Sequence, residues 1–353
     1  MKIALITDTH FGVRNDNQIF AEYFRNFYET QFFPYIDKHN IKTIIHLGDL
    51  VDRRKYVNFV TSNNLYENFI KPIEDRQIDF HCILGNHDLY FKNTLSVNAL
   101  KELYRNNNSV KTIDTPTELE FDSLKVLLVP WICSENYNEC LESLKITRSD
   151  IVMGHFEFNG FEMHRGSFCE HGLSIEPFAK FEKVFSGHFH HKSERGNIHY
   201  LGSPYEMTWS DYDDPKGFHV FDTDTREIEF IQNTTSIFHK IDYDDSEMKL
   251  EDLDDIDFEI FENCYIKLVV KNKTNPYLFD MFVEKVEKAG VANLQIVENL
   301  FYVDNDGDSA ILDEAKSTLD ILDDYISTIE TKTPKKKIKN LFHNLYQEAL
   351  NSE

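Results

Sequence analysis

The sequence predicts an α/β protein whose main part is a two-sheet β-sandwich flanked by helices. Strand-like and helix-like segments alternate from residue 1 to about residue 235, which is the α/β pattern. After Lys125 the strand-like segments follow one another closely, which favours layered sheets over a single doubly wound sheet. Several strand-like segments end on Asp, Asn or His, so we expect polar side chains to gather at one sheet edge.

The chain of 353 residues is longer than one typical core requires, so two or three domains are expected. Its 41% hydrophobic and 14% aromatic residues are sufficient for a packed core and are unlike the composition of a disordered chain. We assign residues 1–240 to the first domain.

The strand-like segments of this first domain are short, apolar and rich in β-branched residues. In chain order they are residues 3–7, 43–47, 80–84, 126–130, 150–153, 184–186, 199–201 and 217–221. The first helix-like segment carries Ile19, Tyr23, Phe24 and Phe27 at three-to-four spacing, which is the periodicity of one helix face.

A small α+β capping domain is predicted at residues 241–303, where the acidic stretch 242–257 marks the boundary. Its β-α-β pattern consists of a strand at 264–271, a helix cap at Asn275 and Pro276, a helix at 278–289 that Gly290 ends, and a strand at 292–297. A unit of about 55 residues is small for independent stability, so it should pack against the first domain.

Residues 309–353 form two amphipathic helical patterns. The first places Leu312, Ala315, Leu319, Leu322, Ile326 and Ile329 in an alternating three-four spacing, which suits packing on a coiled coil. The second begins at Thr333-Pro334. Both need a surface, which either this chain or a partner protein provides. Lys335 to Lys337 lie in the first turn of the second predicted helix, where the helix dipole disfavours cations. Two interpretations remain open: the lysines contact DNA or an acidic partner, or they are simply solvated.

No stretch approaches the roughly 20 apolar residues of a membrane span, and the chain enters its first strand at once, without signal-peptide architecture. We therefore expect a soluble, cytoplasmic protein with no membrane contact. The five cysteines are odd in number, widely spaced and without a CxxC pair, so we expect neither a disulfide framework nor a thiolate zinc site.

The formal net charge of −24 argues against a protein that coats nucleic acid by general electrostatics. A local site can still attract a phosphodiester, because two divalent ions bring more positive charge than the carboxylates of Asp8 and Asp49 cancel. The acidic segments elsewhere are expected to keep the chain soluble or to meet a basic partner.

Five segments that end an apolar run carry metal-ligand residue types. The seven candidate ligands are Asp8, His10, Asp49, Asn86, His155, His188 and His190. A sheet whose strands end on one edge brings such residues together. A two-metal centre needs a bridging carboxylate, and Asp49 is the natural bridge. One ion is assigned to Asp8, His10, Asp49 and His190, and the other to Asp49, Asn86, His155 and His188.

Nitrogen and oxygen donors without a thiolate suit two Mn²⁺ ions, with Mg²⁺, Fe²⁺ and Zn²⁺ left open. His87 is the candidate general acid, because it lies beside the ligand Asn86 and before Asp88, which could orient its ring. A bridging hydroxide would attack phosphorus in line while His87 protonates the leaving oxygen.

A lone histidine on a strand is more often a hydrogen-bonded core residue than a ligand, so each short motif is weak alone. The ordered set of five motifs is what favours a two-metal phosphoesterase site. His46 lies inside a strand and is interpreted as core. His164, His171 and His191 are interpreted as surface polar groups rather than substrate contacts.

Further motifs accompany the candidate ligands: Gly85-Asn86-His87-Asp88-Leu89, Val129-Pro130-Trp131, Asn159-Gly160-Phe161, Ser186-Gly187-His188-Phe189-His190, Tyr200-Leu201-Gly202-Ser203-Pro204 and Asp214-Pro215-Lys216-Gly217-Phe218. Together these motifs resemble the calcineurin-like metallophosphoesterase superfamily and, within it, the SbcD-type DNA double-strand-break repair nucleases. The likeness is closest to the recombination nuclease subunits of T-even-type bacteriophages. It covers about the first 235 residues.

This resemblance implies a Mn²⁺-dependent exonuclease on duplex ends and endonuclease on single strands, acting in double-strand-break processing and recombination. It also implies that residues 241–303 contact DNA and that the helices at 309–353 bind an SbcC-type coiled-coil ATPase, whose ATP binding gates cleavage. The implied assembly is a homodimer within a heterotetramer, in the host cytoplasm if the protein is phage-encoded.

Two other functions remain open. Gly48-Asp49-Leu50-Val51-Asp52-Arg53 is also similar to the serine/threonine phosphoprotein phosphatases, although these have GNHE in place of Gly85-Asn86-His87-Asp88 and lack the capping and terminal units. A non-catalytic architectural subunit of the same fold is the other. The presence of all seven candidate ligands and His87 disfavours it, and tests of metal binding and DNA cleavage would discriminate the two.

Overall fold

The structure is a computed structural model that describes residues 1–164, 167–170, 172–298 and 335. Met1–Met207 and Asp211–Glu298 form one compact unit. His171 and, apart from Lys335, the helices predicted at 309–353 lie outside the described residues. None of the described helices is long and apolar enough to cross a membrane. All five cysteines are buried and free.

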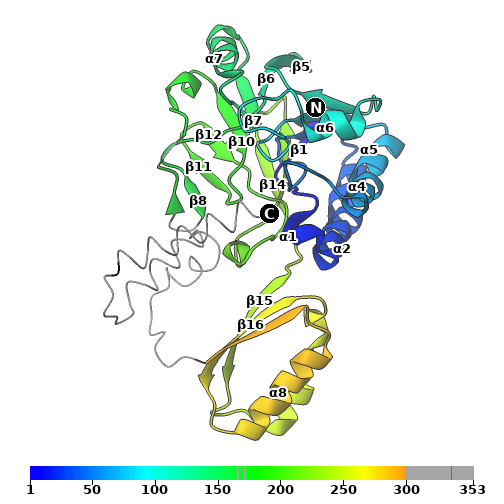
Figure 1. Ribbon diagram of the computed structural model, residues 1–353, viewed down its shortest axis with the longest axis vertical. Coiled ribbons are helices and arrows are strands. Elements are labelled where there is room, and N and C mark those ends of the chain that lie inside the picture. The colour runs from blue at the N-terminus through cyan, green and yellow to red at the C-terminus, as the bar shows by residue number, and fades with distance from the viewer. Residues whose placement is uncertain (165–166, 171, 299–334, 336–353) are drawn as a thin grey trace. The chain divides into compact units, whose positions relative to one another are not determined.

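Two six-stranded sheets form the predicted sandwich (Figure 1). The first has the order β14-β13-β1-β2-β3-β4, and the second β11-β12-β10-β7-β6-β5. The strands of the first sheet are β1 Lys2–Ile6, β2 Thr43–His46, β3 Asp79–Ile83, β4 Val110–Ile113, β13 Gly217–Asp222 and β14 Ile228–Gln232. Those of the second are β5 Thr117–Phe121, β6 Leu124–Val129, β7 Ile151–His155, β10 Lys183–Gly187, β11 Ser193–Arg195 and β12 Ile198–Tyr200. All eight predicted strands are therefore confirmed, and β4, β5, β11 and β14 are additional.

The strands that precede the candidate ligands are parallel within each sheet. In the first sheet β1 pairs with β2 and β2 pairs with β3 in parallel, and in the second β7 pairs with β10 in parallel. Because the carboxyl ends of parallel strands meet at one edge, the loops that leave these strands converge. The outer strands β14, β5 and β11 pair with their neighbours in the antiparallel sense.

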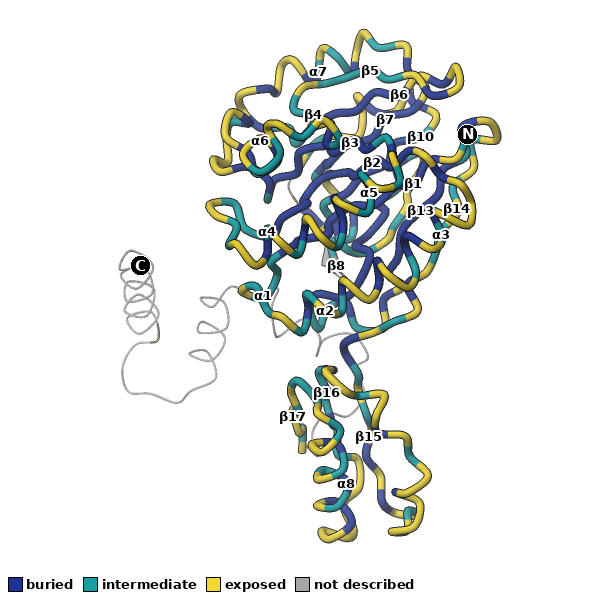
Figure 2. The backbone as a smooth tube through the Cα atoms, turned by 90° about the vertical axis from the view of Figure 1, so that its right-hand side faces the viewer, coloured by how far each residue is buried: buried dark blue, intermediate teal, exposed yellow. Residues whose placement is uncertain are grey.

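The core between the sheets is apolar and fully enclosed. Its buried residues are Ile3, Leu5, Ile45, Leu47, Ile83, Ile113, Phe121, Leu124, Val126, Leu128, Ile151, Met153, Phe185, Leu201 and Phe221. The central strands run through buried positions while the helices outside them carry the exposed residues (Figure 2). This layer anchors the strand ends rigidly, since close-packed interiors yield little to strain.

Helices cover the outer faces of both sheets (Figure 1). They are α1 Val13–Asp16, α2 Gln18–Phe27, the π-helix η1 Tyr28–Phe32, α3 Phe33–Lys38, α4 Phe59–Leu65, the π-helix η2 Tyr66–Ile70, α5 Lys71–Asp75, α6 Ala99–Tyr104, α7 Tyr137–Ile146 and the 3₁₀ turns η3 Glu176–Phe178 and η4 Trp209–Asp211. A hairpin of β8 Glu162–His164 and β9 Ser167–Phe168 follows β7. The predicted face of α2 is confirmed at Phe24 and Phe27, which are buried, whereas Ile19 and Tyr23 are half-buried.

The small unit near the end of the described chain is a three-stranded parallel sheet with one helix. Its elements are β15 Phe238–Asp244, the 3₁₀ turns η5 Leu250–Asp254 and η6 Glu259–Phe261, β16 Tyr265–Asn272, α8 Pro276–Lys288 and β17 Asn293–Val297. The predicted β-α-β elements are present, and the side chain of Asn275 caps α8 by accepting from Tyr277 N and Leu278 N. The strand β15 was not predicted from the sequence, because the acidic run that starts at Asp242 hid the buried Tyr243.

The start of β15 is held by a buried carboxylate of the first domain. Glu206 accepts hydrogen bonds from Ile237 N at 2.8 Å and from Phe238 N at 3.0 Å. The ring of Tyr265 in β16 lies 5.4 Å from that of Phe20. These contacts agree with the expectation that the small unit packs against the first domain.

Candidate metal centre

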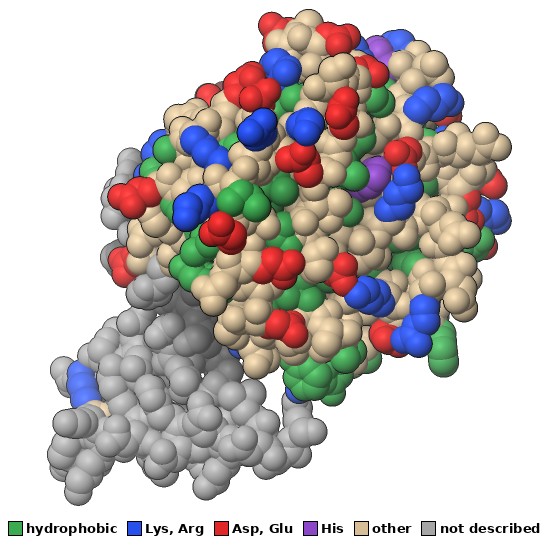
Figure 3. Space-filling view, turned by 90° about the horizontal axis from the view of Figure 1, so that it is seen from above, with side chains coloured by type: hydrophobic (Ala, Val, Ile, Leu, Met, Phe, Trp, Pro, Cys, Tyr) green, Lys and Arg blue, Asp and Glu red, His purple; other side chains and the backbone are tan. Residues whose placement is uncertain are grey.

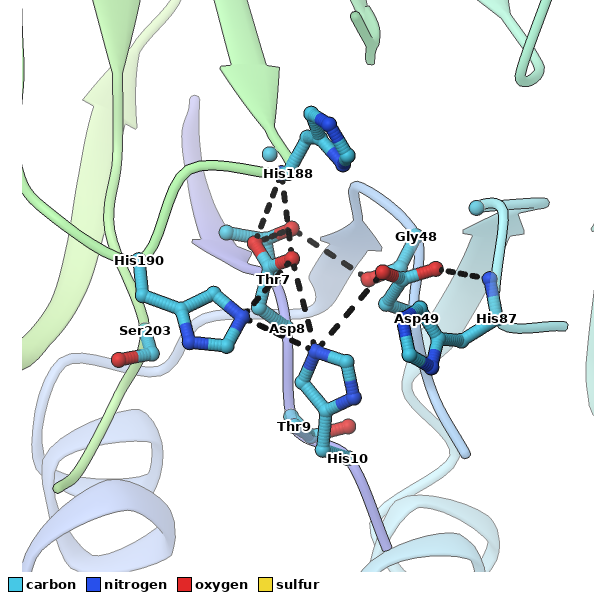
Figure 4. Close-up of polar contacts among 12 residues, drawn as sticks. Thr7, Asp8, Thr9, His10, Gly48, Asp49, His87, His188, His190 and Ser203 are labelled. Atoms are coloured by element: carbon cyan, nitrogen blue, oxygen red, sulfur yellow. Dashed lines mark hydrogen bonds and ion pairs between the residues drawn. The ribbon is translucent and has the colours of Figure 1, made fainter. Parts of the chain in front are cut away.

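All seven candidate ligands converge where the parallel strands end. Asp8 and His10 follow β1 and Asp49 follows β2, while Asn86 follows β3, His155 ends β7, and His188 and His190 follow β10. These residues come from both sheets. Figure 4 shows the rings of His10 and His190 turned toward each other beside the carboxylates of Asp8 and Asp49, while the ring of His188 is turned away from Asp8, to which its backbone N–H donates.

One group consists of Asp8, His10 and His190, whose ligand atoms all lie within 4.8 Å of one another. The Nε2 atoms of His10 and His190 are 3.1 Å apart. His10 Nε2 lies 3.9 Å from Asp8 Oδ1 and 3.8 Å from Asp49 Oδ2. Asp49 therefore borders this group, as the predicted first ion requires.

A second group consists of Asp49, His155 and His188, again within 4.8 Å. His155 Nε2 lies 3.2 Å from Asp49 Oδ2 and 3.1 Å from Asn86 Oδ1. The carboxylate of Asp49 thus lies between the two groups, the place for a bridging ligand. These two groups contain six of the seven candidate ligands, and their division between two ions stays a prediction. A third group of the same spacing consists of His10, Asp52 and His87.

The rear nitrogens of two of these histidines face oxygen acceptors. His155 Nδ1 lies 2.8 Å from the carbonyl of Leu47, and His10 Nδ1 lies 3.4 Å from Asp52 Oδ1. Metal-binding histidines typically donate their second ring nitrogen to such an oxygen, which fixes the tautomer with the other lone pair toward the ion. The ring of His155 is oriented in this way, whereas for His10 the structure gives proximity of Nδ1 to the Asp52 carboxylate and no fixed tautomer.

The glycines that precede the ligands are required by close packing. A Cβ at Gly85 would lie 2.2 Å from Asp49 Oδ1, and a Cβ at Gly187 would lie 2.0 Å from Thr7 Oγ1 and 3.0 Å from Asp8 Oδ2. No larger residue fits at either position without displacing a candidate ligand. This explains the recurrence of Gly before the ligand in the sequence motifs.

Four candidate ligands have the left-handed backbone conformation that non-glycine residues rarely adopt. Their φ angles are 54° at Asp8, 42° at His10, 57° at Asp49 and 90° at His188. Such conformations cost about 1–3 kcal/mol each and cluster at functional sites. Backbone hydrogen bonds hold them, including Asp8 N to Gly48 O at 3.0 Å and His10 N to Asp49 O at 3.1 Å.

The role predicted for Asp88 is wrong. Its carboxylate is fully buried and accepts hydrogen bonds from the backbone N–H groups of Asp49, Leu50, Val51 and Gly85 at 2.8–3.2 Å. These four donors occupy it, so it orients the loop that carries Asp49 and not the ring of His87. Burial, followed by the charge of Asp49, raises the pKa of Asp88 to about 7.

His87 is oriented by Asp52, which was not predicted from the sequence. His87 Nδ1 lies 2.5 Å from the carbonyl oxygen of Asp52, and its backbone N donates to Asp49 Oδ1 at 2.7 Å. A carbonyl only accepts, so Nδ1 carries hydrogen and Nε2 is left for a substrate. Because a backbone carbonyl makes this contact, the residue type at position 52 gave no sequence signal for it.

The charges of the buried carboxylates are set by the surrounding imidazoles. Burial raises the pKa of Asp8, whereas the pKa of Asp49 is held well below its usual range because His155 and other nearby histidines outweigh burial. Burial opposes protonation of His155, but the charge of Asp49 prevails and raises the pKa of His155 to about 9.

The pKa values of the facing pair His10 and His190 are shifted in opposite directions, so that His10 carries the proton and His190 is neutral. Burial lowers the pKa of His10, but the hydrogen bond and charge of Asp52 together with Asp49 and Asp8 outweigh it and raise the pKa to about 9. Burial and then the charge of His10 lower the pKa of His190. Burial, with His155, also lowers the pKa of His188, to about 3.

This donor set fits divalent cations. Two facing imidazole nitrogens 3.1 Å apart cannot both be protonated, and both adjoin buried carboxylates that need positive charge. A cation replaces the shared protons and receives the lone pairs, since metal binding deprotonates its ligands. Nitrogen and oxygen donors without sulfur are typical of Mn²⁺, Fe²⁺ or Zn²⁺.

A buried ion cluster supports the loop that carries His190. Lys216 Nζ donates to the carbonyl of His190 at 2.8 Å and pairs with Asp211 at 2.7 Å and Asp214 at 2.8 Å. Lys216 belongs to the motif Asp214-Pro215-Lys216-Gly217-Phe218, but the sequence assigned it no role. Asp214 also accepts from His191 Nδ1 at 2.8 Å, so His191 is half-buried and paired rather than a free surface group.

His46 is a core residue, as predicted. Its side chain is fully buried, and its two nitrogens contact Thr9 Oγ1 at 3.0 Å and Gly48 N at 3.2 Å. His164 lies in β8.

Two mixed sheets with candidate metal ligands gathered at one edge are the arrangement expected of a metallophosphoesterase. Residues 1–192 match the family model described as calcineurin-like phosphoesterase, so the chain belongs to this family of metal-dependent enzymes. The predicted superfamily and its fold are confirmed.

Three known proteins whose sequences are similar to this chain are nucleases or repair proteins by name. The chain is 34% identical over 360 residues to "Exonuclease subunit 1" of Enterobacteria phage T4, which covers 99% of each chain. It is 26% identical to a subunit of the nuclease SbcCD from Staphylococcus epidermidis, over 80% of this chain and 79% of that one. It is 29% identical to "DNA double-strand break repair protein Mre11" of Sulfolobus acidocaldarius, over 47% of this chain and 44% of that one. The resemblance to SbcD-type nucleases and to the phage protein is confirmed.

We expect Lys216→Met to lower the free energy of unfolding by about 3–5 kcal/mol, because Asp211 and Asp214 would stay buried without their cation. Urea denaturation measures the change. Lys125→Met is the matched control, since its pair with Glu118 is half-exposed and should contribute less than about 1 kcal/mol. Equal small losses in the two variants would contradict a stabilising role for the cluster.

Proposed function

We propose that the chain is a Mn²⁺-dependent DNA nuclease subunit, an exonuclease on duplex ends and an endonuclease on single strands, in double-strand-break processing and recombination. The observation that carries the proposal is the convergence of Asp8, His10, Asp49, Asn86, His155, His188 and His190 on two adjoining ligand groups. The relatives named as an exonuclease subunit, a nuclease and a double-strand-break repair protein support DNA as the substrate.

In this proposal Asp8, His10 and His190 would hold one ion, Asn86, His155 and His188 would hold the other, and Asp49 would be a ligand of both. Divalent ions bound there supply Lewis acidity to the phosphodiester and activate the attacking water. The contact of His155 with the carbonyl of Leu47 would aim its other nitrogen at an ion, and five of the seven candidate ligands, Asp8, His10, Asp49, Asn86 and His155, are buried.

His87 is proposed as the general acid that protonates the leaving oxygen. Its Nδ1–H is fixed on the carbonyl of Asp52, so its Nε2 is the nitrogen that exchanges a proton with substrate. His87 is half-buried beside the ring of His10, at a centroid distance of 4.8 Å, and forms a group of ligand-type atoms with His10 and Asp52. In the proposal it would lie beside the ions and act as an acid rather than as a ligand.

Arg53 ends the motif that is similar to the phosphoprotein phosphatases, but its contacts give that alternative little support. Its guanidinium donates to Asp16 Oδ2 at 2.7 Å and to Asn15 Oδ1 at 2.9 Å, so protein groups already occupy it. The candidate ligand atoms disfavour the alternative of a non-catalytic architectural subunit. Without bound ions, these buried polar atoms would face one another without suitable partners, which is rare in folded proteins.

The proposed division of the chain is a nuclease domain at 1–240, a DNA-contacting capping domain at 241–303 and a partner-binding segment at 309–353. The proposed location is the cytoplasm, which is that of the host if the protein is phage-encoded. Lys240 and Lys267 are register partners on β15 and β16, which supports contact between the capping domain and a phosphate backbone. The face seen in Figure 3 intersperses basic and acidic side chains without a large basic patch, so DNA affinity would depend on such local cations.

The decisive experiment is cleavage of labelled DNA with Mn²⁺ by the parent, His87→Ala and Asp49→Ala. We expect His87→Ala to slow cleavage by about 10²–10⁴-fold while it retains both ions, because the ring holds only the acid proton. Asp49→Ala should lose metal, measured by calorimetry, as well as cleavage. His39→Ala is the control, since His39 is exposed and stacks on Tyr35. Parental cleavage by His87→Ala would remove the acid assignment, and a parent that binds no Mn²⁺ would remove the proposed function.

We propose that the partner is an SbcC-type coiled-coil ATPase bound through residues 309–353. Deletion of Thr333–Glu353 should release the purified ATPase in a pull-down, because the second apolar stripe would be lost. Metal-dependent cleavage of short substrates should persist, which controls for folding. Retained ATPase binding would assign the interface to another part of the chain.

A homodimer through α4 completes the proposed assembly. Phe59 and Val60 are exposed apolar residues in the first turn of this helix, Tyr56 is exposed just before it, and Phe59 is 94% exposed. Apolar side chains gathered in this way mark interaction surfaces, and a second copy of the same helix offers a matching surface.

Phe59→Glu should convert the dimer to a monomer in sedimentation velocity, because a symmetric contact places the charge twice in one apolar interface. Ile146→Glu, which changes an exposed apolar residue at the end of α7, should leave the dimer intact. A parent that sediments as a monomer, or a Phe59→Glu dimer, would exclude this interface.

A further inference from the structure

Thr9 and His46 lie behind the candidate metal centre without being candidate ligands. Thr9 separates Asp8 from His10, and His46 is the last residue of β2, three positions before Asp49. Both side chains are fully buried. Neither the sequence motifs nor the proposed chemistry uses them.

The two side chains form a directed chain of hydrogen bonds. His46 Nδ1 accepts from the backbone N–H of Gly48 at 3.2 Å, so in the neutral ring the hydrogen is on Nε2. His46 Nε2 then donates to Thr9 Oγ1 at 3.0 Å, and the Thr9 hydroxyl donates to the carbonyl of Leu50 at 3.2 Å. Every donor has one acceptor, which is the arrangement expected of a buried polar network that fixes a geometry.

The ring of His46 stays neutral, as this chain of bonds requires. Burial, followed by the charge of His155, lowers the pKa of His46 to about 3. Its tautomer is therefore determined by Gly48 alone. Phe69 covers the ring at a centroid distance of 6.2 Å, which keeps water from competing with Thr9.

The network joins the two loops whose spacing matters most. One loop presents Asp8 and His10, and the other presents Asp49, and all three residues are in the left-handed conformation. Backbone bonds such as Asp8 N to Gly48 O already connect the loops along their length. The side chains of Thr9 and His46 add a second connection from inside the core, which limits rotation of one loop against the other.

We propose that Thr9 and His46 are positioning residues that set the distance between the Asp8–His10 loop and the Asp49 carboxylate, so that two ions bind as one bridged pair. This inference rests on the two-ion site of the proposed function and adds which residues determine its spacing. Supporting residues behind a ligand typically change metal affinity by 10–100-fold when they are removed.

The test compares Thr9→Val, Thr9→Ser and the parent, loaded with Mn²⁺ alone. Valine has the shape of threonine without the hydroxyl, and serine retains the hydroxyl. Thr223→Val is the matched control, since Thr223 is also buried and donates to a backbone carbonyl, that of Met1, at the opposite end of β1. Calorimetry measures the affinity for each ion, and electron paramagnetic resonance distinguishes an exchange-coupled Mn²⁺ pair from isolated ions.

For Thr9→Val we expect one of the two affinities to fall about 10–100-fold and the coupled signal to give way to that of isolated Mn²⁺. Thr9→Ser and Thr223→Val should keep both affinities and the coupled signal, and thermal melting verifies that each variant is folded. His46→Gln, which loses the acceptor for Gly48, should weaken the same ion.

Coupled spectra and parental affinities in both Thr9→Val and His46→Gln would overturn the inference, as would an equal loss in Thr9→Ser. A general loss of stability would affect Thr223→Val as strongly as Thr9→Val, and that result would also overturn it. A parent that binds no Mn²⁺ pair would instead overturn the proposed two-ion site itself, so the two failures are distinguishable.

Discussion

The structure depends on the burial of two carboxylates, Asp8 and Asp49, at the place where the two sheets meet. Both are almost completely removed from solvent. Buried charges are costly unless neutralised, and imidazoles supply the positive charge here, with His155 nearest to Asp49 at 3.2 Å. Positions of the surrounding loops are constrained by this requirement.

Support for the charged centre comes from polar groups behind it. Asp88 accepts four backbone hydrogen bonds and immobilises the loop of Asp49, while Lys216 binds the carbonyl of His190 from the opposite side. Glycines at 85 and 187 permit the loops to approach one another. The left-handed backbone at the ligands is therefore stabilised by its surroundings, which is the usual condition for strain at a functional site.

The acidic surface and the cationic centre have different effects on a nucleic-acid substrate. A net charge of −24 repels a polyanion at long range, but screening limits this to about 8 Å at physiological ionic strength. At short range the proposed ions dominate. A nuclease of this composition gains most from a partner that holds DNA against it, which accords with the proposed ATPase partner.

The sequence by itself determined eight of the twelve sandwich strands and the residue types at their ends, because hydrophobic periodicity is a local property of each strand. The short or polar strands β4, β5, β11, β14 and β15 escaped it. It also determined the capped helix α8 through Asn275. Only the tertiary structure decided which polar residues support the ligands. Asp88 follows His87 directly, yet its carboxylate binds backbone 37–39 residues earlier in the chain. Asp52 contacts His87, and Lys216 reaches His190, for the same reason: a side chain's partner is set by packing, not by proximity along the chain.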